Sequence, residues 1–219
     1  STLGTQAIQY GWITGEQDMR TASEMLTAML NRAAVTLSPI QKGPDIVLSG
    51  GNLTAKIATN TATWNTVRSF YQRRHSGIPI NDSVLQWEVT LDAFAGGAAD
   101  AVAFGLARNS GVLNDILSTN GWGYKFEGGA SYMITPGTVS TATTPNWVGA
   151  AGDVFSLSFD LSNHRLAVYK NGVALGASTL EAVAAPNNRV MPAVSIKRNS
   201  GAVVTQFTMN LGATPFKYP

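Results

Sequence analysis

The strongest constraint on the fold of this chain is the alternation of apolar and polar residues that begins after about position 45. Every second residue is apolar in the segments 84–92 and 155–161, and in 203–211 apart from Thr205. Successive side chains of a β-strand point to opposite faces, so this pattern predicts strands with one buried face. The run 101–107 is apolar throughout and predicts a strand buried on both faces.

A hairpin is predicted where Asn171 and Gly172 separate the short segments 165–170 and 173–175. Both residues tolerate the positive φ angles that a two-residue hairpin turn requires. Many short strands with frequent turn signals predict one antiparallel β-sandwich or barrel.

The first forty residues follow a different period. Thr14 and Gln17 form a capping-box pattern, and apolar residues then recur every three or four positions, which predicts a helix of about five turns. A lone helix of this length is marginal in water, so its apolar stripe must pack on the sandwich, on other copies or on a larger assembly. We predict that this stripe is an anchor or oligomerisation face, formed by Met19, Met25, Leu26, Met29 and Leu30.

Proline and glycine punctuate the segment that follows this helix. Ser38-Pro39 and Gly43-Pro44 predict a linker. The predicted organisation is therefore a helical segment with its linker at 1–44 and a β-sandwich at 45–219.

Composition narrows the range of partners. The 219 residues include 15 basic and 13 acidic side chains, and the net charge of +2 makes too weak a field to predict nucleic-acid binding. No apolar run approaches the roughly 20 residues of a membrane span, so no membrane insertion is predicted, and residues 1–9 lack the pattern of a signal peptide. Only 13% of the residues are charged and none is cysteine, a composition common in secreted, cell-surface and virion proteins.

Catalytic chemistry finds little support in the residue pattern. Glu88 and Asp92 are expected on one strand face about 13 Å apart, beyond the roughly 5–9.5 Å between the carboxyl groups of glycosidases. We therefore predict that they belong to a solvated face. His75 and His164 are predicted loop residues without an orienting acid, and the ligand types of a metal site are not clustered. The sequence predicts no enzyme, no cofactor and no metal, and leaves a loop calcium site open.

Several segments from position 85 to the end resemble the SPRY domain family in the order in which they occur. The resembling segments are LQWEVTL at 85–91, GWGY at 121–124, GDVFSLSFDL at 152–161, RLAVYKNGVALG at 165–176, MPAVS at 191–195, MNLG at 209–212 and PFKYP at 215–219.

This resemblance covers about 48–219 and implies an all-β, concanavalin-like jelly roll of two antiparallel sheets. It further implies a non-catalytic scaffold whose loops recognise proteins or short peptides. Similar domains also occur in bacteriophage structural proteins. The segment 61–80 does not match the loops of the eukaryotic adaptors, so their peptide-contact residues are not carried over.

Three segments are candidate recognition loops, because sandwich loops are held rigidly by the sheets and because aromatic and arginine side chains are enriched at binding hot spots. Leu113 is either an exposed anchor or a residue tucked under its loop. The candidate ligand-binding residues are Tyr71, Arg73 and Arg74 in 70–77, Asn109, Leu113 and Asn114 in 108–114, and Lys197 and Arg198 at a hairpin tip expected over 197–200.

These observations favour a homo-oligomeric phage virion surface protein, such as a receptor-binding, fibre or decoration subunit, that binds a protein or glycan partner through sandwich loops. One alternative is a cytoplasmic adaptor that captures a short peptide. A second alternative is a lectin-like glycan-binding module, and an active glycan hydrolase is the least favoured.

Overall fold

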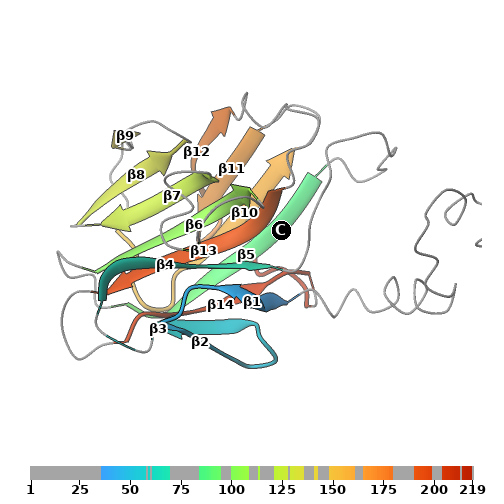
Figure 1. The fold of residues 1–219 in the computed structure, drawn as a ribbon. Coiled ribbons are helices and arrows are strands. Elements are labelled where there is room, and N and C mark those ends of the chain that lie inside the picture. The colour runs from blue at the N-terminus through green and yellow to red at the C-terminus, as the bar shows by residue number, and fades with distance from the viewer. Residues whose placement is uncertain are drawn as a thin grey trace, which may run out of the picture.

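The computed structural model describes part of the chain. The described residues are 36–57, 59, 61–69, 84–94, 100–108, 113, 121–127, 129–135, 141–142, 148–160, 165–179, 190–198, 204–212 and 214–218. They form two antiparallel sheets that lie face to face (Figure 1). This arrangement confirms the prediction of a two-sheet antiparallel sandwich.

The first sheet, called here the β13 sheet, has the strand order β1-β4-β13-β6-β7-β8-β9. Its strands are β1 (Leu37–Lys42), β4 (Thr61–Ser69), β6 (Ala101–Arg108), β7 (Gly121–Glu127), β8 (Ala130–Ile134), β9 (Thr141–Ala142) and β13 (Val190–Arg198).

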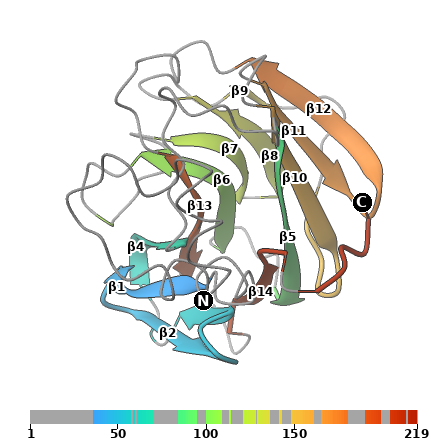
Figure 2. The same cartoon turned by 90° about the vertical axis from the view of Figure 1, so that its right-hand side faces the viewer.

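The second sheet, called here the β5 sheet, has the strand order β12-β11-β10-β5-β14-β3-β2. Its strands are β2 (Ile46–Ser49), β3 (Thr54–Ile57), β5 (Val84–Ala93), β10 (Val154–Asp160), β11 (Arg165–Lys170), β12 (Val173–Thr179) and β14 (Gln206–Asn210). Figure 2 shows the two layers, with β6, β7 and β13 in one and β5, β10 and β11 in the other.

The core lies between the sheets and is built by the predicted alternation. Trp87 on β5 pairs in register with Leu157 on β10, and both side chains are fully buried. The ring centroid of Phe155 on the β5 sheet lies 4.5 Å from that of Phe104 and 5.2 Å from that of Phe126, both on the β13 sheet. Burying each such side chain stabilises the fold by about 1.5–3 kcal/mol. Because the rings come from both sheets, this burial stabilises the packing of the two layers.

Strand β6 is buried on both faces, as its uninterrupted apolar sequence predicts. Phe104 points into the main core, whereas Ala103 and Ala107 belong to a second cluster on the outer face of the β13 sheet. Ala193 and Ile134 complete that cluster, and all four side chains are at most 2% exposed. The centre of this outer face is therefore not a free surface.

Two glycines let β6 and β7 approach closely. A Cβ atom at Gly105 would lie 1.9 Å from the carbonyl oxygen of Trp122, and one at Gly123 would lie 2.1 Å from that of Phe104. Backbone atoms inside a sheet cannot move away from such a contact. These two positions therefore exclude every side chain.

The predicted linker is wrong in part, because residues 37–42 form β1 and pair with β4. Pro39 suggested a break, since proline cannot donate a hydrogen bond to a strand ladder. β1 is the edge strand of its sheet, so one side of its backbone has no neighbouring strand to donate hydrogen bonds to. A proline is tolerated in such a strand. The first strand thus precedes the expected boundary at position 45.

The other predictions of local structure have different outcomes. Asn171 and Gly172 have φ angles of 50° and 81° and join β11 to β12, which confirms the hairpin. The N-terminal helix, with Met19, Met25, Leu26, Met29 and Leu30, lies outside the described residues and stays a prediction. Among the residues that are described, no helix has the length and hydropathy to cross a membrane.

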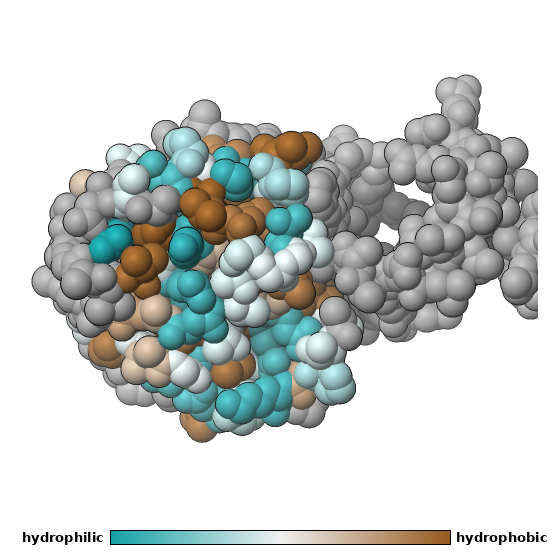
Figure 3. Space-filling model, turned by 90° about the horizontal axis from the view of Figure 1, so that it is seen from below, coloured by the Kyte–Doolittle hydropathy of each residue, from teal (hydrophilic) through white to brown (hydrophobic). Residues whose placement is uncertain are grey.

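The face of the molecule drawn in Figure 3 carries small hydrophobic groups. Seen from the side on which β2 lies in Figure 1, brown residues form small groups separated by hydrophilic ones (Figure 3). Two large apolar side chains on the edge strands β1 and β2 are exposed. Ile40 on β1 is 78% exposed, and Val47 on β2 is 42% exposed.

Candidate binding surface

The strands that precede two of the three predicted recognition loops end on the same side of the β13 sheet. β4 and β6 both pair antiparallel with β13, so they run in the same direction. The segments that carry Tyr71 to Arg74 and Asn109 to Asn114 follow the last residues of these two strands. Apart from Leu113, these candidate residues lie outside the described part of the chain, and their roles stay predictions.

Leu113 is held by β4. Its carbonyl oxygen accepts the backbone N–H of Thr66 at 2.8 Å, and the residue is half-buried. Leu113 follows β6 in the sequence, but β13 lies between β6 and β4, so Leu113 contacts a strand two places away from β6. This position favours the tucked alternative over an exposed anchor.

Lys197 and Arg198 lie in β13, so the prediction of a hairpin tip at these residues is wrong. Lys197 pairs in register with Ala101, and Arg198 pairs with Thr61. Strand pairing thus continues to the position where the sequence suggested a turn. Both residues belong to the end of β13 opposite the loops that follow β4 and β6. Arg198 is 8% exposed, and the binding role of the pair stays a prediction.

Lys197 belongs to a strip of charged and aromatic side chains on the outer face of the β13 sheet. Glu127 lies between Lys197 and Lys125, with N–O distances of 2.7 and 3.0 Å. Lys197 lies over Trp64 at 6.0 Å from the ring centroid, and Lys125 lies over Tyr132 at 5.1 Å. Burial would raise the pKa of Glu127, but the two lysines outweigh this effect and hold it below its ordinary value.

Glu88 is buried, which corrects the prediction of a solvated position. Its Oε1 accepts hydrogen bonds from Ser156 Oγ at 3.1 Å and from the Tyr218 amide at 2.8 Å. Its Oε2 accepts the Lys217 amide at 2.9 Å. The carboxylate therefore holds the C-terminal tail on the outer face of the β5 sheet. Asp92 has the predicted exposure, and its Oδ2 accepts a hydrogen bond from Thr208 Oγ1 at 2.7 Å.

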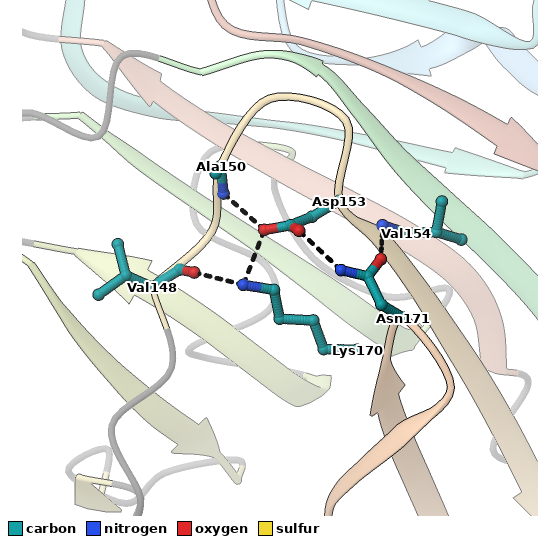
Figure 4. Close-up of polar contacts among 6 residues, drawn as sticks. All are labelled: Val148, Ala150, Asp153, Val154, Lys170 and Asn171. Carbon is teal, nitrogen blue, oxygen red and sulfur yellow. Dashed lines mark hydrogen bonds and ion pairs between the residues drawn. The ribbon is translucent and has the colours of Figure 1, made fainter.

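Asp153 organises the turn next to the β11–β12 hairpin (Figure 4). Its Oδ2 accepts the Ala150 amide at 2.7 Å and pairs with Lys170 Nζ at 2.8 Å. Its Oδ1 accepts a hydrogen bond from Asn171 Nδ2 at 2.8 Å, and Asn171 Oδ1 accepts the Val154 amide at 2.9 Å. Burial would raise the pKa of Asp153, but the hydrogen bonds and the ammonium charge of Lys170 keep it below its ordinary value.

Comparison with known proteins identifies the architecture. No family model matches the sequence, and no curated protein matches it. Solved structures do match, among them the SPRY domain of human HERC1, with a TM-score of 0.58, 13% identity, and coverage of 82% of this chain and 99% of that domain. The fold is that of an SPRY domain. The partial match of the sequence motifs therefore indicated the correct architecture.

Two further structures support the SPRY fold. A human SPRY domain matches with a TM-score of 0.54 at 16% identity, covering 78% of this chain and 98% of that one. The PSpry domain of TRIM65 matches with a TM-score of 0.54 at 14% identity, covering 85% of this chain and 98% of that domain. At such identities the likeness carries over no binding residue, so the surface must be read from this chain.

Sequence reasoning missed one surface of the SPRY sandwich, a hollow on the outer face of the β5 sheet. It has a volume of about 230 Å³ and lies between the C-terminal tail and β11. Its residues come from segments far apart in the sequence, so no local pattern predicts it. Tyr169 and Tyr218 are the two aromatic residues that could have drawn attention to it. Among the described residues, no group of three His, Asp or Glu side chains could hold a metal ion.

Proposed function

We propose that this chain is a non-catalytic recognition module that binds a protein partner through the loops at one end of its β13 sheet. The observation that carries this proposal is the common direction of β4 and β6. Because both strands end on the same side of β13, the predicted loops with Tyr71, Arg73 and Arg74 and with Asn109 and Asn114 start from one end of the sheet. Rigid elements that present loops with aromatic and arginine side chains are typical of binding surfaces.

Three carboxylates of the described residues support a role in the scaffold rather than in catalysis. Glu88 holds the C-terminal tail, Asp153 holds a turn, and Glu127 joins two lysines. A general acid or base needs a proton that it can exchange with a substrate. The hydrogen bonds and ion pairs of these three carboxylates assign them to the scaffold instead.

The test is a quantitative binding measurement with a partner identified by affinity capture. Replacing Arg73→Ala and Arg74→Ala together is expected to weaken binding at least tenfold, and Asn109→Ala with Asn114→Ala is expected to act in the same direction. Arg165→Ala is the matched control, because Arg165 is exposed on the β5 sheet. Loop variants that bind as the unaltered protein does, or an Arg165→Ala variant that loses binding, would overturn the proposal.

We further propose that the module acts on a virion surface as a homo-oligomer. The low charge content supports this location, and the predicted Met and Leu stripe before β1 supports self-association. Light scattering should report a multimer that becomes a monomer when residues 1–35 are removed, and purified particles should contain the protein. A monomeric full chain that is absent from particles would instead favour the cytoplasmic adaptor.

A further inference from the structure

The hollow on the outer face of the β5 sheet is a built feature of three strands and the C-terminal tail. Its volume of about 230 Å³ is below the roughly 300–1,000 Å³ of sites for drug-sized ligands. A ligand of this site must therefore be small, or must insert one small terminal group. The lining residues are Gln86 on β5, Ser156, Leu157 and Ser158 on β10, Tyr169 on β11, Gly172 in the hairpin turn and Tyr218 in the tail.

The wall formed by Tyr218 is held in place by the fold. Glu88 accepts the amide of Tyr218 at 2.8 Å, and Gln86 Nε2 donates a hydrogen bond to the Tyr218 carbonyl at 3.4 Å. A Cβ atom at Gly172 would lie 3.0 Å from Cδ1 of the Tyr218 ring, so the ring packs against the glycine. Figure 2 shows the tail, drawn in red, running to the side of the sheet where β12 lies.

The opposite wall offers an exposed aromatic ring. Tyr169 lies on the outer face of β11 opposite Ser156, and it is 36% exposed. Tyr218 is half-buried, and Lys217 Nζ lies 5.5 Å from its ring centroid. Tyr169 is therefore the ring that a ligand can cover most easily.

The polar groups of the lining are uncharged, and Leu157 contributes apolar surface beside them. Ser156 and Ser158 supply hydroxyl groups, and Gln86 supplies a carboxamide. Ser156 donates its proton to Glu88 and keeps lone pairs that can accept. None of the described residues that line the hollow carries a formal charge, and both oxygens of Glu88 are occupied by the tail and Ser156. A charged ligand would lose its hydration here without gaining an ion pair in the lining.

We propose that this hollow binds a neutral saccharide, with one sugar ring against Tyr169 and its hydroxyl groups bonded to Gln86 and Ser158. A sugar ring has a face rich in C–H bonds and an edge of hydroxyl groups. An aromatic wall beside hydroxyl and carboxamide groups complements both features. The volume fits a single terminal residue of a glycan. This site lies on the β5 sheet and is separate from the loops of the proposed protein interface.

Saturation-transfer NMR and calorimetry with methyl glycosides of glucose, galactose, mannose and N-acetylglucosamine test this inference on the full chain. At least one of them is expected to bind, and Tyr169→Ala should raise its Kd at least tenfold. Tyr169→Phe keeps the ring and should retain most of the affinity. Tyr132→Ala is the matched control, because Tyr132 is half-buried on the β13 sheet and should leave binding unchanged.

Several results would overturn the inference. The first is that none of the four glycosides binds. The second is that Tyr169→Ala binds a glycoside with the same affinity as the unaltered protein. The third is that methyl glucuronide binds and its neutral counterpart does not, because the ligand would then need a carboxylate. If the Tyr169→Ala variant no longer binds the protein partner, the hollow belongs to the protein interface instead. The Arg73 and Arg74 variants are expected to keep saccharide binding, so failures of the two proposals can be told apart.

Discussion

Replacing Glu88→Gln tests whether one buried carboxylate holds the C-terminal tail on the sandwich. The two side chains have nearly the same shape, so the change removes the charge and one acceptor without opening a cavity. Oε1 accepts from Ser156 and Tyr218, and Oε2 accepts from Lys217. Glutamine can keep the first oxygen, but its NH₂ group then faces the Lys217 amide, and two donors oppose each other.

The magnitude follows from these contacts. An unsatisfied buried amide costs about 1–3 kcal/mol, and each remaining bond loses about 1 kcal/mol when its acceptor becomes neutral. The variant should therefore lose about 3–5 kcal/mol if the tail stays docked. The tail can also detach, which limits the loss of global stability to its docking free energy. We expect a measured loss of at most about 5 kcal/mol and a released tail.

Hydrogen exchange and urea denaturation measure both effects. The amides of Lys217 and Tyr218 should exchange at least tenfold faster in Glu88→Gln than in the unaltered protein. Asp92→Asn is the control, because Asp92 is exposed and accepts side-chain hydrogen bonds, so its loss should stay below about 1 kcal/mol. Unchanged exchange and stability in Glu88→Gln would refute the view that this carboxylate holds the tail.

Two further changes test the scaffold. Gly105→Ala should lower the free energy of unfolding by more than about 3 kcal/mol, because its Cβ would overlap the Trp122 carbonyl. Gly51→Ala is the control and should cost about 1–2 kcal/mol, because Gly51 has open space around it and a φ of 66°. Equal losses of the two variants in urea denaturation would contradict this reasoning. The lowered pKa of Asp153 adds stability above its ordinary pKa of about 4, and this contribution is lost as the pH falls through the lowered value. Asp153→Asn should therefore flatten that part of the acid unfolding curve, and an unchanged slope would show that the ion pair with Lys170 adds nothing.

Much of the fold was predictable because strand alternation is a local signal. The pattern over 84–92 predicted a strand with one buried face, on which Trp87 lies, and Asn171-Gly172 marked its hairpin, since both features depend on neighbouring residues only. The edge strand β1 was missed because Pro39 normally signals a break, and only the neighbouring strands show that its missing N–H is tolerated.

The candidate surfaces were predictable only in part, because they depend on distant contacts. Glu88 was expected in solvent, and its burial results from amides 129 and 130 residues further along the chain. The hollow likewise joins Gln86 to a tail residue 132 positions away. Lys197 was expected at a loop tip because no local signal marks how far β13 continues. The loops after β4 and β6 were recognised from their composition, and the strand pairing shows that they start at one end.

Photo-crosslinking tests whether a partner is recognised through one end of the β13 sheet. A photoreactive amino acid is placed at Tyr71, at Asn109 or, as a control, at Val173, which is 58% exposed on β12. The two loop positions are expected to crosslink to the same partner, and position 173 is expected to give no product with it. Crosslinking of that partner from position 173 but from neither loop would contradict the proposed interface.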